Sequence, residues 1–332
     1  MAETNRLLIG GIIVSLSVAA FIPLYFVFIV PNQPILPLLI DLQHKRYVID
    51  GLGRVVAVPK DPKRIVSLAP SNTEILHNIS CEKSRVVGRT TQCNYPPEWS
   101  DIIVIGDYWG PDIELILGVQ PDLVIGRDTP EHTPLISQLE SAKIAIFIMP
   151  KEETVGDIFS NMELIGYLVN KKDYATQSVS KLEIALEKIT NSDNGTGNST
   201  LLPIRVKTYY EIWPGSSVEG DNVWIAGGGN WIGDAIFKAG GMNLGSFFAE
   251  TWQEIEWPAL ELVVLDPEHI IIQDSSHWNT IINRPGWSNV PAVENESYTI
   301  INVDIIQRPG PRIVEAIYVL AKGLCPNLFP WL

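Results

Sequence analysis

The segment that decides the fold spans residues 61–74 and reads DPKRIVSLAPSNTE. Residues 64–68 form a short apolar run that is typical of a buried β-strand, and Ala69-Pro70 turns the chain. Ser71 and Glu74 have the spacing of a capping box, which predicts a helix with Ser71 as its N-cap. The segment is therefore expected to fold as strand, turn and helix.

The same alternation of strand and helix continues along the chain. Before the decisive segment, residues 47–50 and 54–58 flank Gly51 and Gly53 and predict a hairpin. After it, strand-like and helical runs alternate at residues 101–106, 113–119, 121–126 and 144–149. A second series of this kind starts at residue 204. Alternating strands and helices predict a mainly parallel sheet with helices on both faces.

Residues 154–190 separate the two series and are mostly helical. Apolar residues recur at steps of three and four over Val179–Ile189, which is typical of an amphipathic helix. An ordinary surface helix has the same spacing. The chain is therefore expected to form two α/β lobes, residues 45–153 and 193–332, joined by connecting helices at residues 154–192.

The N-terminal region carries a long apolar stretch. Residues 7–30 contain no charged side chain, and a helix of this length would span about 36 Å, enough to cross a bilayer. A cleavable signal peptide is the competing interpretation, but its apolar part is typically about 7–15 residues long. Three prolines at residues 31–37 predict a semi-rigid stalk. Residues 1–44 are therefore expected to form a single-pass transmembrane anchor and a stalk, with the body outside the cytoplasm.

Four triplets fit the Asn-x-Ser/Thr pattern of N-glycosylation, at Asn78, Asn194, Asn198 and Asn295. Such triplets also arise by chance in a chain rich in these residues. They are consistent with an external glycoprotein.

The composition excludes several classes of function. The 24 Lys and Arg residues minus the 38 Asp and Glu residues give a net charge of −14, which is unsuited to nucleic acid. Hydrophobic residues make up 46% of the chain, which is enough for folded cores. The three cysteines, Cys81, Cys93 and Cys325, are too few for a disulfide scaffold and lack the paired spacing of a zinc site.

No segment carries a strong catalytic signature. The chain has no His-Glu-x-x-His, no Gly-x-Ser-x-Gly and no phosphate-binding Gly-x-x-x-x-Gly-Lys motif. Its histidines are scattered, and no acid–base pair stands out. The glycines at residues 227–233 lack the preceding buried strand and the nearby acid of a dinucleotide site. No catalytic residue, metal ligand or cofactor is therefore expected.

Aromatic residues beside glycine and proline are the most conspicuous feature of the predicted loops. The aromatic residues concerned are Tyr95, Tyr108, Trp109, Trp213, Trp224, Trp231 and Trp252. Large rings in loops at the carboxyl ends of strands are suited to line a cleft for a flat or bulky ligand. Rings in such loops also cap hydrophobic cores, which is the alternative for each of them.

A polar group near the C-terminus is presented from a constrained turn. Arg308 precedes Pro309-Gly310-Pro311, with Asp304 and Arg312 close by in the sequence. A guanidinium binds carboxylate, phosphate or amide oxygens in a planar fork. A surface ion pair between Arg308 and Asp304, of little energetic value, is the alternative.

These residues resemble the solute-binding proteins of ABC importers for cobalamin and ferric siderophores. The decisive segment resembles the opening of that family, and residues 93–97, CNYPP, resemble its Asp-Tyr-Pro loop. Residues 114–124 resemble its Glu…Pro-Asp-Leu-Val signature, and residues 239–243 and 308–312 also have counterparts. The resemblance covers about residues 46–325, nearly the whole predicted body.

The resemblance implies two Rossmann-like lobes bridged by one long α-helix, with the ligand between them. It implies a protein that is not an enzyme and that hands its ligand to the permease dimer of an ABC transporter. In that family a glutamate on each lobe docks to the permease. Glu114 matches the first position. The second position falls on Leu260, with Glu261 one residue along, so Glu261 is the expected second contact.

The resemblance also implies which residues bind the ligand. Trp109 and Trp213 are added to them because they are aromatic residues of the predicted loops. The expected ligand-binding residues are Tyr95, Tyr108, Trp109, Trp213, Trp252, Asp304 and Arg308. The expected ligand is a metal chelate, namely a corrinoid, a ferric siderophore or haem. Two alternatives remain open on the same scaffold: an enzyme that processes a chelate, and a surface interaction module without a ligand.

Overall fold

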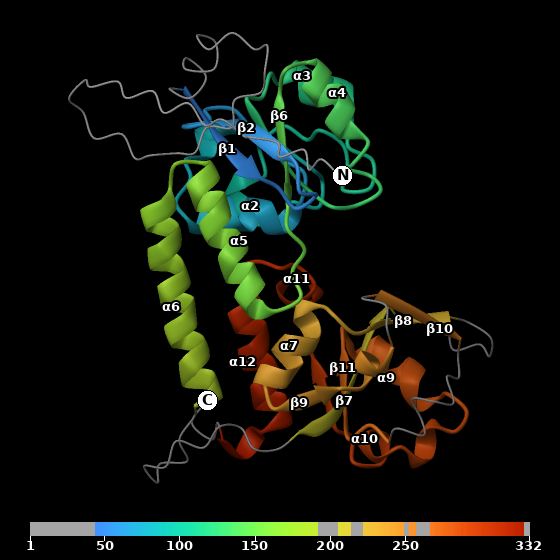
Figure 1. The fold of residues 1–332 in the computed structure, drawn as a ribbon. Coiled ribbons are helices and arrows are strands. Elements are labelled where there is room, and N and C mark those ends of the chain that lie inside the picture. Colours follow the sequence, from blue (N-terminus) through green and yellow to red (C-terminus); the bar gives the residue numbers. More distant parts are fainter. Residues whose placement is uncertain (1–43, 192–204, 214–221, 249–251, 257–265, 329–332) are drawn as a thin grey trace, which may run out of the picture. The chain divides into compact units, whose positions relative to one another are not determined.

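The computed structural model describes residues 44–191, 205–213, 222–248, 252–256 and 266–328 (Figure 1). Among these residues, no helix is both long and apolar enough to cross a bilayer. The predicted anchor and stalk lie outside the described residues, apart from residue 44.

A four-stranded parallel sheet, called the first sheet here, contains the decisive segment. Its strands in spatial order are β4 (Val86–Arg89), β3 (Ile65–Ser67), β5 (Leu123–Arg127) and β6 (Ala145–Met149). Every residue of β3 is buried, as expected for a central strand whose two faces are both covered. Successive residues join separate apolar clusters on opposite faces, as Ile65 and Val66 do. The predicted parallel sheet is confirmed in this part of the chain.

Three α-helices accompany the first sheet, namely α2 (Pro70–Asn78), α3 (Ile113–Gly118) and α4 (Leu135–Ser141). The predicted hairpin is confirmed as β1 (Lys45–Ile49) paired antiparallel with β2 (Val55–Pro59). The predicted strand at residues 101–106 is wrong. Its Val104 forms only an isolated bridge to Arg89, because the segment runs past the last residue of β4.

The predicted capping box of α2 is also wrong. Ala69 is the N-cap, Pro70 lies in the first turn, and no side chain caps the helix. Proline suits this position because it has no N–H group to leave unpaired. Glu74 does not reach back to Ser71. Its side chain is only 1% exposed and is paired with groups outside the helix.

The second sheet has six strands among the described residues. The hydrogen-bonded order is β10 (Trp252–Glu256), β8 (Asn222–Ala226), β7 (Val206–Trp213), β11 (His269–Ile272) and β12 (Tyr298–Ile300), with β9 (Gly241–Asn243) also paired to β7. The pairs β7–β9, β7–β11 and β11–β12 are parallel, whereas β7–β8 and β8–β10 are antiparallel. The second sheet is therefore mixed, because β8 and β10 extend it antiparallel.

Five α-helices accompany the second sheet among the described residues. They are α7 (Trp231–Lys238), α9 (Ser275–Ile282), α10 (Pro291–Glu294), α11 (Val303–Ile306) and α12 (Ile313–Leu324). Short 3₁₀ helices lie at Lys83–Arg85, Pro97–Trp99, Leu244–Phe247, Trp287–Asn289 and Pro326–Leu328. The two sheets fall within the ranges expected for two lobes, whose boundaries at residues 153 and 193 stay a prediction.

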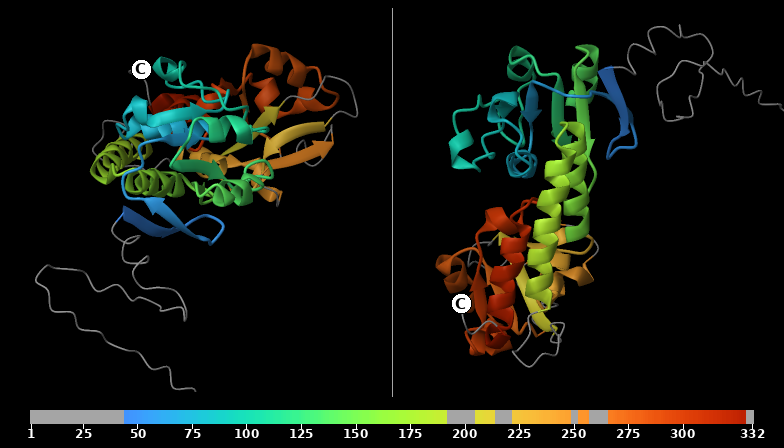
Figure 2. Two further views of the ribbon diagram at one scale, coloured as in Figure 1. Left: turned by 90° about the horizontal axis from the view of Figure 1, so that it is seen from above. Right: turned by 90° about the vertical axis from the view of Figure 1, so that its left-hand side faces the viewer.

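Two helices connect the sheets, in the segment where connecting helices were expected, whereas the resemblance implied one long helix. They are α5 (Val155–Leu168) and α6 (Lys172–Thr190), which lie side by side (Figure 2). The helix breaks because Asn170 has a left-handed backbone, with φ 61°, which reverses the chain. The two helices pack closely, since a Cβ on Gly166 would lie 2.3 Å from the Ala175 Cβ.

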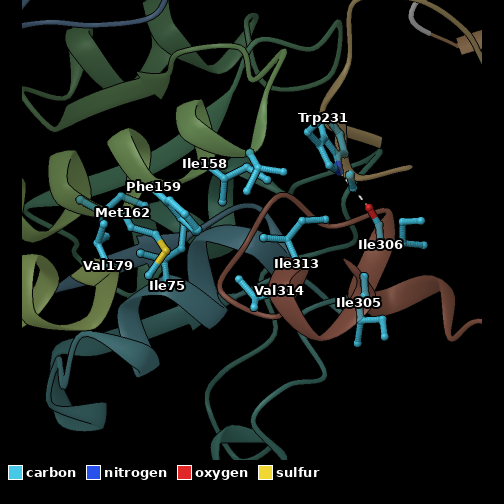
Figure 3. Packing of buried hydrophobic residues seen from close by; sticks show 14 of the residues in the cluster. Ile75, Ile158, Phe159, Met162, Val179, Trp231, Ile305, Ile306, Ile313 and Val314 are labelled. Carbon is cyan, nitrogen blue, oxygen red and sulfur yellow. Dashed lines mark hydrogen bonds between the residues drawn. The ribbon is translucent and has the colours of Figure 1, made fainter. Parts of the chain in front are cut away.

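One apolar cluster is shared by both sheets and the connecting helices. Figure 3 shows Ile75 of α2 near Met162 of α5, with Ile313 of α12 in the same cluster. At the start of α5, the Val155 amide donates a hydrogen bond to the Asp234 carboxylate of α7. The two sheets are therefore joined through packed side chains as well as through the chain itself.

A fully buried charged group lies behind the second sheet. Arg284 donates two hydrogen bonds of 2.6 Å to the Glu211 carboxylate, and His277 Nε2 lies 2.7 Å from the same group. Burial by itself raises the pKa of Glu211, but the hydrogen bonds from Arg284 and His277 hold this pKa below its ordinary value. The carboxylate is therefore charged in the folded protein and neutralises a buried guanidinium.

We expect Glu211→Gln to lower the free energy of unfolding by about 3–5 kcal/mol, because it removes the negative charge that Glu211 places against the buried Arg284 guanidinium. Urea unfolding followed by circular dichroism measures the change. Glu187→Gln, on the exposed face of α6, is the matched control and should change stability by less than about 0.5 kcal/mol. Equal stabilities for the two variants would contradict a charged Glu211–Arg284 pair.

Candidate functional site

A cleft of about 1040 Å³ lies between the two sheets. Its lining comes from the carboxyl ends of strands on both sides, such as Arg127 at the end of β5, Lys151 after β6 and Ile212 in β7. Parallel strands bring their carboxyl ends to one edge of a sheet, which is where α/β proteins form ligand sites. The volume is at the upper end of the range typical of small-molecule sites.

Aromatic rings from both sides form the walls of the cleft. Tyr108 and Trp109 belong to the first-sheet side, and their ring centroids are 5.5 Å apart. Trp224, Trp231 and Trp252 belong to the second-sheet side. Three of these indoles remain open to solvent, with exposures of 65% for Trp109, 39% for Trp224 and 38% for Trp252. Exposed apolar rings in a concave site are available to bury a ligand surface.

Trp231 is held in place by its neighbours. Its indole Nε1–H donates a hydrogen bond of 2.8 Å to the Ile306 carbonyl, drawn as a dashed line in Figure 3. The Trp252 ring meets it edge-on, with centroids 5.6 Å apart. Asn230 caps the N-terminus of α7 and so fixes the start of the helix that carries Trp231. This wall is therefore preorganised.

A buried ion pair positions the first cation of the cleft. Arg127 binds Glu152 with both nitrogens of its fork, and its Nη1–Oε1 distance is 2.9 Å. Glu152 also accepts a hydrogen bond of 2.7 Å from Asn161 of α5. Burial by itself lowers the pKa of Arg127, but Glu152 holds this pKa above its ordinary value. Arg127 is therefore charged, oriented and already neutralised.

A second cation of the cleft, Arg308, is held from both sides. Its Nη1 lies 2.7 Å from the Asn94 Oδ1 atom and 3.1 Å from Glu74 Oε1. Its Nη2 lies 2.6 Å from the Asp304 carboxylate. The expected pair with Asp304 therefore exists, but Arg308 also reaches across to the first-sheet side. Only 13% of its side chain is exposed.

The expected ligand-binding residues fall into three groups. The residues that line the cleft are Tyr108, Trp109, Trp252, Asp304 and Arg308. Tyr95 is not in the lining; its ring lies under the Arg312 guanidinium, 4.2 Å away. The side chain of Trp213, at the end of β7, lies outside the described residues.

The structure describes one of the two expected docking residues, Glu114. Glu114 is exposed in the first turn of α3, beside the exposed Leu115. Glu261 lies outside the described residues. Both roles stay predictions.

Several lining residues were not among those expected to bind the ligand. Trp224 and Trp231 carried a visible signal, since they flank the triple glycine at residues 227–229. Arg127 and Lys151 carried none, because a single cation after a strand is common in α/β chains. They come together at the carboxyl ends of β5 and β6 only when the sheet has formed.

No metal centre is recognisable in the described part of the chain. It contains no group of three or more His, Cys, Asp or Glu residues placed to hold an ion. Cys81, Cys93 and Cys325 are buried and free. The described side chains therefore offer no built-in metal.

A buried histidine supports the Tyr108 wall. His132 Nδ1 accepts a hydrogen bond of 3.1 Å from the Arg127 amide, so its Nε2 carries the proton and donates to the Tyr108 carbonyl. Burial lowers the pKa of His132 to about 4. Burial likewise lowers the pKa of His269, in β11, to about 4. Both rings are therefore neutral at pH 7.

We expect the protein to lose stability as the pH falls from about 6.5 to 4. Over this range the unfolded chain binds protons at His132 and His269 that the folded chain excludes. Each histidine then removes about 3 kcal/mol of unfolding free energy. Urea unfolding at pH 7 and pH 4 measures the loss. His269→Gln should remove about half of the histidine contribution, and an unchanged pH dependence in this variant would contradict the assignment.

Comparisons with known proteins agree with this geometry. Residues 65–301 match the periplasmic binding protein family. An uncharacterized ABC transporter substrate-binding lipoprotein of Bacillus subtilis, YvrC, is 24% identical over 282 residues, which cover 84% of this chain and 85% of the relative. A cobalamin-binding protein of Halobacterium salinarum is 23% identical over 282 residues, covering 82% of this chain and 72% of the relative.

A solved structure shows the same fold. The periplasmic haem-binding protein of Pseudomonas aeruginosa superimposes with a TM-score of 0.65 at 20% identity, covering 80% of this chain and 93% of that protein. Relatives of this chain thus include proteins named for different ligands. The family match spans most of the described body, from the strand of the decisive segment to just past β12. The chain belongs to the periplasmic binding protein family.

Proposed function

We propose that this chain is the extracytoplasmic solute-binding protein of an ABC importer and that it carries a bulky metal chelate in the cleft. The observation that carries the proposal is the set of five aromatic rings around a cleft of about 1040 Å³. A corrinoid, a ferric siderophore or haem offers broad apolar surfaces that such rings bury. The chelate enters and leaves unaltered, because the described lining presents no nucleophile paired with a base.

The charges around the cleft favour a chelate with little net charge. Arg127 is neutralised by Glu152, and Arg308 is neutralised by Glu74 and Asp304. The other charged lining residues, Asp128 and Lys151, have opposite signs. A highly anionic ferric chelate would have to compete with these carboxylates for the arginines. A chelate with little net charge, such as a corrinoid or a ferric hydroxamate, therefore fits better than an anionic one.

We expect Trp252→Ala to weaken chelate binding by about 1–3 kcal/mol, the scale of losing a buried aromatic contact. Isothermal calorimetry with cobalamin, haem and a ferric hydroxamate measures this change against the wild-type protein. Phe237→Ala is the control, since Phe237 is an exposed ring of α7 outside the cleft lining.

Unchanged affinity in Trp252→Ala would place the binding site elsewhere. Conversion of a bound chelate would support the enzyme alternative. Absence of binding by all three probes, together with capture of a protein partner, would support the interaction module.

Delivery to a permease is proposed to involve Glu114. The carboxylate is exposed on α3, and Leu115 and Leu117 of the same helix are also exposed. An exposed charge with apolar side chains nearby is suited to docking onto a complementary cation. Glu261 is the proposed second docking residue.

We expect Glu114→Lys to reduce uptake at least tenfold while chelate affinity stays unchanged, because repulsion replaces an attractive contact at the docking surface. Transport into proteoliposomes that contain the permease, with labelled chelate, measures the effect. Glu98→Lys, an exposed carboxylate elsewhere on the first-sheet side, is the control. Loss of chelate binding in Glu114→Lys would mean that Glu114 supports the pocket instead.

The location of the protein is part of the same proposal. The uncharged stretch at residues 7–30 is proposed to tether the chain to the membrane with the body outside the cytoplasm. Asn78 and Asn295 are exposed and are proposed to accept glycans. Asn194 and Asn198 lie outside the described residues.

A further inference from the structure

A single buried carboxylate links the two sides of the cleft. Glu74 is the fifth residue of α2, on the first-sheet side, and is 1% exposed. In the described residues, both of its cationic partners, Arg308 and Arg312, come from the segment between α11 and α12 on the second-sheet side. Its charge is therefore neutralised only across the cleft.

The contact with Arg312 has the geometry of a bidentate pair. Arg312 Nε lies 2.9 Å from Glu74 Oε2, and Nη2 lies 2.6 Å from Oε1. Two parallel N–H···O bonds fix both the distance and the relative orientation of the two groups. The Tyr95 ring lies 4.2 Å from the same guanidinium. Arg312 is thus held between two residues of the first-sheet side.

The contact with Arg308 extends this linkage into the cleft. Glu74, Asn94 and Asp304 engage its two terminal nitrogens. These contacts use at most three of the five N–H donors of a guanidinium. Because Arg308 also lines the cleft, the remaining donors are directed by the same three partners. The direction in which Arg308 meets a ligand therefore depends on Glu74.

The turn that carries both arginines lies directly on α2. A Cβ added to Gly310 would be 3.6 Å from a Glu74 carboxylate oxygen and 3.8 Å from Ser71. Pro309 and Pro311 restrict the backbone on either side. The arginines therefore have little freedom to follow Glu74 if α2 moves, and the pair resists separation of the two sides.

We propose that Glu74 is a positioning residue: its carboxylate sets the spacing of the two sheets across the cleft and orients Arg308 toward the ligand. The role of Glu74 in setting the distance between the sheets applies to the protein without ligand. The Arg308 part rests on the proposed function, because it needs a ligand in the cleft. Two carboxylates and two guanidiniums, from Glu74, Asp304, Arg308 and Arg312, balance in formal charge, so the linkage is stable without a ligand.

The spacing is measured by spin labels in the full-length protein without ligand. Ser137→Cys on α4 and Asn279→Cys on α9 provide exposed labelling sites on the two sides, and the native cysteines are buried. Double electron–electron resonance then gives the distribution of distances between the labels. We expect Glu74→Gln to lengthen and broaden this distribution relative to the labelled parent. An unchanged distribution would overturn the spacing role.

The orientation of Arg308 is measured by calorimetry with cobalamin, haem and a ferric hydroxamate. For each probe that binds the parent, Glu74→Gln should weaken binding roughly tenfold or more, the scale of a lost hydrogen bond to a charged group. Asp304→Asn should weaken binding but leave the label distance unchanged, because its side-chain oxygen can still accept the 3.4 Å hydrogen bond from Asn94 and because Glu74 keeps both of its arginines. Unchanged affinity in Glu74→Gln would overturn the orienting role.

Two further variants separate positioning from general destabilisation. Ile79→Ala removes a fully buried side chain just after α2 and should lower stability while leaving label distance and affinity unchanged. If Glu74→Gln fails to fold, Arg312→Lys keeps the charge but loses the fork, and it should still lengthen the distance. A parent that binds none of the probes would refute the proposed function, whereas the distance measurement would still decide the spacing role.

Discussion

The structure depends on an ion pair that crosses from one sheet to the other. Glu74 is buried on α2, and its charge is met only by arginines of the opposite side among the described residues. A buried carboxylate without a counter-ion is strongly unfavourable, so the two sides stabilise each other at one spacing. Ile75 and Ile313, which follow Glu74 and Arg312 in the chain, belong to the apolar cluster that both sheets share. Hydrophobic burial holds the sides together, and the ion pair fixes how they meet.

The connecting helices restrict movement in the same direction. The helices α5 and α6 pack closely where Gly166 meets Ala175. Such a helix pair resists bending more than an extended linker would. The start of α5 is bound to α7 through Asp234, and Glu152 links α5 to Arg127 in the cleft. Large domain closure would break several of these contacts at once. The geometry therefore favours a cleft that is already formed before the ligand arrives.

The lining of the cleft combines broad apolar rings with cations that are already paired. Rings such as Trp231 are fixed by hydrogen bonds and edge contacts, so little ordering is needed when a ligand binds. Arg127 and Arg308 are neutralised by carboxylates, so they add little net positive charge to the cleft. This arrangement suits reversible binding of a bulky chelate.

The sequence by itself determined the strand–turn–helix unit at residues 61–74, the β1–β2 hairpin and the aromatic loops, because these features depend on local spacing and on neighbouring residues. It misassigned Glu74 to a local helix cap. The spacing of Ser71 and Glu74 is the same whether Glu74 caps the helix or pairs with a distant arginine, so the sequence does not distinguish the two. The break at Asn170 and the antiparallel extension of the second sheet also escaped it. Only the tertiary structure brought Glu74 to Arg312 and placed Trp224 and Arg127 around one cleft. These residues are far apart in the chain and come together only when both sheets are packed.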